Sequence, residues 1–291
     1  MRLDRRHMLA GTALFVVEAP ANSEFEVRKN IAYRSDPEAD PIRHRLDLYL
    51  PKAGGKFPWL IYVHGGGWSK GSKDLYARLG ETFADQGIGT AVINYRLTPQ
   101  VMHPEHARDV ARAVAWLHRN SDSLGGDKTR IHLCGHSAGA HLSALLALDP
   151  RYLTAVGLAP SVLRGVIPIS GPYALGPSAF GEVFGADRKA RRDASPIFHV
   201  KDLPAKDIPE FLVLVADRDM ASLPMSARLF NTALEREGVR SSLAIIPDRD
   251  HGSIVIRIPG PGDPVAERIV TFVQGGRQVS RARPQNLRPR P

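Results

Sequence analysis

Two glycine-rich strings hold the residues whose types and spacing could do chemistry. In the second string, GHSAG at Gly135 to Gly139, Ser137 stands two positions from a glycine on either side. This spacing is typical of a sharp turn from a strand into a helix, which exposes the serine hydroxyl. The run Arg130 to Cys134 predicts the strand, and the helix-forming stretch Ala138 to Leu148 predicts the helix. The pattern therefore indicates nucleophilic catalysis by Ser137.

The first string, HGGGW at His64 to Trp68, follows the apolar run WLIYV. Acyl transfer builds negative charge on the former carbonyl oxygen, and one backbone N–H aimed at that oxygen stabilises it by about 3 kcal/mol. Consecutive glycines let the backbone approach that closely, and a helix N-terminus favours an anion. We therefore predict an oxyanion hole made by the amides of Gly66, Gly67 and Ala138.

A serine nucleophile needs a base, and the base needs a carboxylate that orients it. Downstream of Ser137, the strand predicted at Phe211 to Ala216 is followed by two carboxylates, Asp217 and Asp219. Asp219 lies deeper in the loop, next to a helix start at about Leu223. We predict Asp219 as the acid, with Asp217 bracing the turn.

The predicted base is His251. It follows the strand predicted at Ser242 to Ile246, so it would lie at the same edge of the sheet as Ser137. His199 and His103 compete with it, but neither follows a core strand after the acid. His136 is interpreted as the variable position of the turn around Ser137.

Apolar strands alternate with amphipathic helices along the chain, which predicts an α/β fold with a mostly parallel central sheet covered by helices on both faces. An opening pair of antiparallel edge strands is predicted at Glu24 to Arg34 and His44 to Leu50. The segments that alternate after this pair are Trp59 to Val63, Leu75 to Gln86, Gly89 to Asn94 and Glu105 to Asn120.

In these motifs and in further strings, the chain resembles serine esterases of the α/β-hydrolase fold, in the group of carboxylesterases, feruloyl-esterase-like proteins and kynurenine formamidases. The resemblance runs from Phe25 to Val273 and includes the strings LDLYLP, HGGGW, YRL, HPEHARDVARAVAWL, GHSAGAHLSAL, GVIPISGPYAL, VADRD and DHGSI. It implies the triad Ser137, Asp219 and His251, with the oxyanion hole at Gly66, Gly67 and Ala138. It also implies a structural role for Asp109, paired with Arg96.

The formal net charge of +9 does not predict a nucleic-acid partner, because five arginines lie in the acid-free tail GGRQVSRARPQNLRPRP. The sequence predicts no cofactor and no metal site. The expected partner is a small-molecule ester, and the protein is expected to be a monomer or homodimer without a stable membrane anchor. The single Cys134 is interpreted as a core residue.

Three domain segments are predicted. Residues 1–21 hold paired arginines, a short apolar run and an A-P-A ending, which resembles a twin-arginine export signal. This favours an exported protein, with a cytoplasmic location as the alternative. Residues 22–274 form the hydrolase domain, and residues 275–291 form a disordered basic tail.

A small lid is predicted between Ser170 and Pro209, where only about forty residues are available. We expect a rather open pocket near Trp68, Tyr173, Phe180 and Phe184. Of these four, Trp68 and Tyr173 are predicted to bind substrate. Packing within the lid is the alternative role for these aromatic side chains. Such a pocket favours short-chain or aromatic acyl groups.

Three functions of different kinds fit these features. The first is a carboxylesterase that hydrolyses small esters through an acyl-enzyme. The second is an amide-cleaving relative, for which an arylformamidase is favoured over a serine peptidase because the chain lacks a large extra domain. The third is a non-catalytic ligand-binding protein, which the complete set of serine, carboxylate and histidine disfavours.

Overall fold

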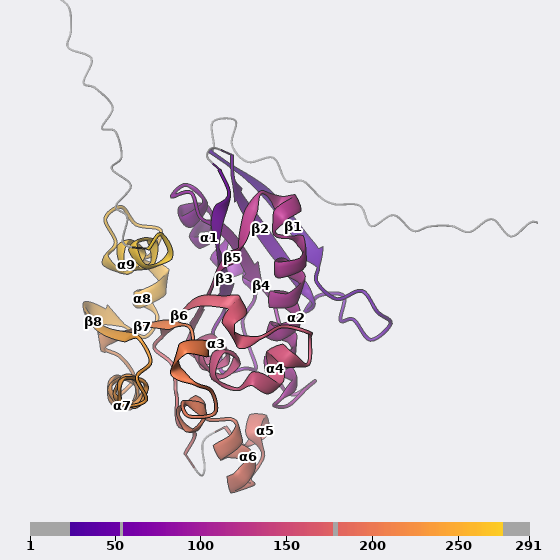
Figure 1. The fold of residues 1–291 in the computed structure, drawn as a ribbon. Helices are drawn as coiled ribbons and strands as arrows, with labels where there is room; N and C mark the ends of the chain where they lie inside the picture. Colours follow the sequence, from indigo (N-terminus) through magenta and orange to yellow (C-terminus); the bar gives the residue numbers. More distant parts are fainter. Residues whose placement is uncertain (1–23, 53–54, 177–179, 276–291) are drawn as a thin grey trace, which may run out of the picture.

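One eight-stranded sheet runs through the molecule (Figure 1). The computed structural model describes residues 24–52, 55–176 and 180–275 of the 291-residue chain. The strand order is β1-β2-β4-β3-β5-β6-β7-β8. Strand β2 is antiparallel to both β1 and β4, and every later pairing is parallel. The strands are β1 Phe25–Ala32, β2 Arg45–Pro51, β3 Phe57–Val63, β4 Gly89–Ile93, β5 Gly126–His136, β6 Leu163–Ile169, β7 Glu210–Arg218 and β8 Ser241–Asp250.

Helices cover both faces of the sheet, which confirms the predicted α/β class. Core residues of α2, α3, α4 and α7 pack on one face, and those of α1, α8 and α9 pack on the other. The helices are α1 Ala77–Ala84, α2 Glu105–Asn120, α3 Ala138–Leu148, α4 Pro150–Thr154, α5 Gly181–Phe184, α6 Arg188–Asp193, α7 Leu223–Arg236, α8 Ser253–Ile256 and α9 Pro264–Val273. Single 3-10 turns lie at Lys73–Tyr76, Asp122–Leu124, Pro160–Val162, Pro196–His199 and Ala205–Asp207.

The central strands are apolar along their whole length because both of their faces are covered. All seven residues of β3 are buried. Ile61 belongs to the same core cluster as Leu142 of α3 on one face, whereas Leu60 belongs to the cluster of Ile269 of α9 on the other. This alternation follows from the two-residue period of a strand, and it divides the core into two layers.

Most predicted elements occur where the sequence placed them. Helices α2 and α3 have the predicted bounds, and β1 and β2 form the predicted antiparallel pair at one edge. The helix predicted at Leu75 to Gln86 is instead a 3-10 turn followed by α1. Lys73 explains the difference: its Nζ lies 2.8 Å from Asp47 Oδ1 of β2, and its N–H donates to Asn94 Oδ1. These distant partners hold the chain in the tighter turn.

The segment between β6 and β7, where a small lid is predicted, holds α5, α6 and two 3-10 turns among its described residues. Helices α5 and α6 lie together at the end of the molecule opposite the β1 and β2 labels in Figure 1. Strand β6 and helix α9 had no individual prediction. Among the helices of the described residues, none is both long and apolar enough to cross a membrane. The export signal at residues 1–21 and nearly all of the predicted tail at 275–291 lie outside the described residues, so both stay predictions.

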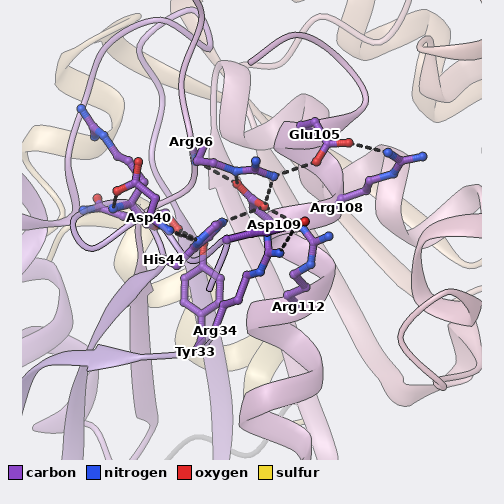
Figure 2. A network of polar contacts seen from close by, with 12 residues as sticks. Tyr33, Arg34, Asp40, His44, Arg96, Glu105, Arg108, Asp109 and Arg112 are labelled. Carbon is purple, nitrogen blue, oxygen red and sulfur yellow. Dashed lines mark hydrogen bonds and ion pairs between the residues drawn. The ribbon is translucent and has the colours of Figure 1, made fainter. Parts of the chain in front are cut away.

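Asp109 of α2 is the centre of a buried ion network (Figure 2). Its side chain is fully buried and accepts two hydrogen bonds of 2.8 Å from the Arg96 guanidinium, which confirms the pairing with Arg96. His44 Nε2 lies 3.0 Å away, and Arg112 Nη1 lies 2.8 Å away. Burial alone would raise the pKa of Asp109, but the contacts with His44 and Arg96 outweigh burial and hold the pKa well below its usual range. His44 directly precedes β2, and Arg96 follows β4. The network therefore links α2 to the ends of these two strands.

Replacing Asp109 by asparagine should destabilise the fold in a pH-dependent way. The lowered pKa means that the carboxylate stabilises the folded state above pH ~4 and that this contribution is lost as the pH falls. At pH 7 we expect Asp109→Asn to lower the free energy of unfolding by about 3 kcal/mol, since Arg96 and Arg112 lose the buried carboxylate that they share. Urea unfolding at pH 7 and pH 3 measures the difference, which should shrink at pH 3. Asp122→Asn, which removes the exposed ion pairs with Lys56 and Lys128, is the control. An equal loss in both variants would contradict the role of the network.

Candidate active site

Ser137 lies at the turn between β5 and α3, with φ 55° and ψ −116°. A non-glycine residue rarely adopts a positive φ, so the surrounding packing must hold it there. A Cβ added to Gly139 would lie 2.1 Å from the Val63 carbonyl oxygen, and one added to Gly135 would lie 2.3 Å from the Gly139 carbonyl oxygen. Gly139 is therefore required because the first turn of α3 approaches β3 so closely, and Gly135 because the end of β5 approaches that same turn.

The structure brings together the three residues predicted to act on an acyl group. Ser137 Oγ lies 3.0 Å from His251 Nε2, and His251 Nδ1 lies 2.7 Å from Asp219 Oδ1. Because an ionised carboxylate only accepts hydrogen bonds, Nδ1 carries the proton and Nε2 accepts from the serine hydroxyl. His251 precedes α8, and Asp219 follows β7, so both stand at the carboxyl edge of the sheet.

Asp219 is held in its ionised form by its hydrogen-bond donors. Its side chain is fully buried, which by itself would raise the pKa. Hydrogen bonds from His251, from the Ser170 hydroxyl and from the Met220 N–H outweigh burial, and the pKa of Asp219 lies below its ordinary value. The carboxylate is thus charged at neutral pH and able to stabilise an imidazolium.

Asp217 has a different place. Its two carboxylate oxygens accept the backbone N–H groups of Asp248 and Arg249, each at 3.0 Å. These two residues lie near the end of β8, just before His251. Asp217 therefore braces the segment that leads to the base and makes no direct contact with the base.

The loop Gly65 to Trp68 lies directly against Ser137. A Cβ added to Gly65 would be 3.1 Å from Ser137 Cβ. Gly66 and Gly67 have φ values of 115° and 59°, in the region that glycine adopts most readily. Within the described residues, no acceptor is recorded for the N–H groups of Gly66 and Gly67. Ala138 is the first residue of α3, where N–H groups have no partner within the helix. These three donors are free to bind a developing oxyanion.

The predicted substrate contacts of Trp68 and Tyr173 need correction. Tyr173 is fully buried and stacks on Phe230 with ring centroids 4.2 Å apart. Trp68 is 1% exposed and packs edge-on against Phe180 and Phe184. Both side chains therefore lie inside the protein rather than on a pocket surface. Phe180 is the exposed aromatic of this group, at 47%.

Two residues near the site were not singled out from the sequence. Ser170, which directly follows β6, donates its hydroxyl proton to Asp219 Oδ2. His64 is fully buried beneath the glycine loop and stacks on Tyr95, whose hydroxyl donates to the His64 carbonyl oxygen. The string GVIPISGPYAL contained Ser170, but nothing in its spacing pointed to a partner 49 positions away.

The competing histidines lie elsewhere. His199 Nδ1 pairs with Asp202, and its Nε2 donates to the Asp193 carbonyl oxygen within the lid. His103 packs between Tyr152 and Phe184. In the part of the chain that the structure describes, no group of three histidine, cysteine, aspartate or glutamate side chains is arranged to hold a metal ion.

This sheet, with a serine, a histidine and a carboxylate at its carboxyl edge, has the α/β-hydrolase fold. The BD-FAE family model matches residues 46–154, which include the glycine loop and the turn at Ser137. Over this range the chain is similar to carboxylesterase-type proteins of this fold.

Three similar proteins illustrate the relationship. Esterase LipC of Mycobacterium tuberculosis is 33% identical over 89% of this chain and 66% of its own length. The probable isoprenylcysteine alpha-carbonyl methylesterase ICMEL2 of Arabidopsis thaliana is 27% identical over 85% of this chain and 63% of its own. Among solved structures, an esterase of Pyrobaculum calidifontis superposes with a TM-score of 0.67 at 26% identity, covering 79% of this chain and 81% of that one.

The chain spans less than two thirds of the length of either curated relative. The activities given in the names of these relatives are therefore properties of those longer proteins. All three names are those of esterases, and they give no support to the arylformamidase alternative.

Asp219→Asn should reduce kcat/KM far more than Asp217→Asn. An asparagine side chain at position 219 carries no negative charge, so it does not fix the proton on His251 Nδ1 as the carboxylate does. Loss of the acid from such a triad costs roughly 10⁴-fold in kcat. Asp217→Asn keeps one acceptor for the backbone of Arg249, so its main effect should be on thermal stability. Steady-state kinetics and thermal melting of both variants separate the two roles. A larger kinetic loss in the Asp217 variant would show that the acid has been assigned to the wrong residue.

Proposed function

We propose that the protein is a serine hydrolase that cleaves small carboxylic esters through an acyl-enzyme intermediate. The observation that carries the proposal is the continuous contact from Asp219 through His251 to Ser137, beside the unpartnered N–H groups of Gly66 and Gly67. The esterase names of the relatives support the same class of reaction.

The first half of the reaction acylates the serine. Ser137 Oγ attacks the ester carbonyl carbon while His251 Nε2 takes the hydroxyl proton. The carbonyl oxygen becomes an oxyanion, which accepts hydrogen bonds from the glycine loop and the α3 N-terminus. When the tetrahedral intermediate collapses, the C–O bond to the alcohol breaks and the His251 imidazolium returns its proton to the leaving oxygen.

The second half repeats these steps with water. His251 Nε2 takes a proton from a water molecule, whose oxygen attacks the acyl carbon and forms a second oxyanion in the same hole. Collapse breaks the bond to Ser137 Oγ, which regains its proton from His251. The products are the carboxylic acid and the free enzyme, and the charge on Asp219 stabilises the imidazolium in both halves.

Ser137→Ala should abolish ester turnover and leave the fold intact, because the side chain serves the reaction rather than the core. Hydrolysis of p-nitrophenyl butyrate measures the activity, and circular dichroism measures the melting temperature. An alkyl phosphonate ester should add to the parent at Ser137, as shown by intact mass and peptide mapping, and should leave the variant unmodified. Turnover by the variant within tenfold of the parent would contradict the proposed nucleophile.

Short acyl chains should be the preferred substrates. The helices described in the lid, α5 and α6, are short, and three of the aromatic side chains expected at the pocket, Trp68, Tyr173 and Phe184, are buried. Each buried methylene contributes about 0.8 kcal/mol, which is about fourfold in kcat/KM, only while an apolar wall is available. We expect kcat/KM along the p-nitrophenyl acyl series to peak between acetyl and butyryl and to fall by octanoyl. A maximum at decanoyl or beyond would show that the lid forms a long acyl tunnel.

A further inference from the structure

The side chain of His136 connects the nucleophile strand directly to the loop that holds the base. His136 is the last residue of β5, next to Ser137, and it is 7% exposed. Its Nε2 lies 2.8 Å from the backbone carbonyl oxygen of His251, 115 positions further along the chain. The two imidazole rings lie beside each other, with centroids 4.7 Å apart and planes tilted by 42°.

The chemistry of these contacts determines the protonation of His136. A carbonyl oxygen only accepts a hydrogen bond, so Nε2 must carry the proton. Burial lowers the pKa of His136 to about 4, with the neighbouring His251 as a second cause, and leaves the ring neutral at pH 7. The unprotonated Nδ1 faces the glycine loop, where a Cβ added to Gly65 would come within 3.0 Å of it. His136 is therefore packed as a neutral donor between the base and the oxyanion loop.

The backbone of His251 needs such an anchor. Asp250 ends β8, where it pairs with Arg218 of β7, and the hydrogen bonds after it close a local turn, since they join Asp250 to Gly252 and Ser253. Asp217 holds the segment before that turn through the N–H groups of Asp248 and Arg249. Asp219 and Ser137 bind only the imidazole of His251. Among the side-chain hydrogen bonds recorded for the described residues, the one from His136 Nε2 reaches the main chain of His251 itself.

We propose that His136 is a positioning residue for the base. Its Nε2–H holds the His251 carbonyl and thereby sets the distance between His251 Nε2 and Ser137 Oγ. Because the ring is neutral, it does this without repelling the imidazolium that forms when His251 takes the serine proton. This role rests on the proposed ester hydrolysis. It adds to the three residues of the triad a fourth, His136, which donates a hydrogen bond from the turn around Ser137.

Two amide variants separate a fixed donor from mere packing. The side-chain nitrogen of glutamine reaches about as far as Nε2 of histidine, whereas that of asparagine reaches only as far as Nδ1. We expect His136→Gln to keep kcat within about threefold of the parent, and His136→Asn to lose about 10- to 100-fold in kcat with KM nearly unchanged. His136→Phe, which keeps the ring and removes the donor, should lose as much as the asparagine variant.

His132 offers a matched control on the same strand. It is also buried, and its Nδ1 lies 3.3 Å from the Trp59 carbonyl oxygen, but it lies away from Ser137. His132→Asn makes the same chemical change and should leave kcat close to that of the parent. The melting temperature of each variant shows whether a kinetic loss comes from unfolding.

A second measurement does not depend on turnover. The proton between His251 Nδ1 and Asp219 should give a far-downfield proton NMR resonance in the parent, in His136→Gln and in His132→Asn. Without the anchor, His251 moves and the resonance should broaden or disappear in His136→Asn and His136→Phe. Equal kcat values and equal spectra for the glutamine and asparagine variants would overturn the positioning role. A parent that hydrolyses no ester would contradict the proposed function, and the spectra would still test the position of His251.

Discussion

The close approach of α3 to the end of β3 is the constraint on which the site depends. With no side chain at Gly139, the helix starts against the Val63 carbonyl, and the strand before it must turn sharply to meet the helix. That turn holds Ser137 at φ 55° and directs its hydroxyl toward His251. The same contact brings the glycine loop, which continues β3, over the serine. One packing contact thus places the nucleophile and the oxyanion donors together.

Buried carboxylates perform two different tasks in this protein by the same physical means. Asp109 and Asp219 are both enclosed, which would raise their pKa values, and both accept enough hydrogen bonds to lower them instead. Around Asp109 the donors are the side chains of His44, Arg96 and Arg112, and the result is a cross-link between α2 and its neighbours. Around Asp219 the donors are His251, a hydroxyl and a backbone N–H, which leaves a charge directed at the base.

The base is held from two sides by groups of different kinds. Asp219 orients the imidazole, while Asp217 and His136 hold the backbone on either side of the turn at Asp250. Histidine has a short side chain with few rotamers, so the position of its ring depends on the position of its own main chain. A site of this kind depends on hydrogen bonds that never touch the substrate.

The sequence by itself determined the features that depend on neighbouring residues. The strand, turn and helix around Ser137, the bounds of α2 and α3, and the glycine loop after β3 all follow from local spacing and apolar periodicity. Only the tertiary structure decided which contacts the residues outside these motifs make. It buried Trp68 and Tyr173, and it brought Ser170 and His136 to partners 49 and 115 positions away. Local sequence patterns indicate whether a side chain is apolar or polar. Its contact partner depends on which elements pack side by side, and this arrangement is a property of the whole sheet.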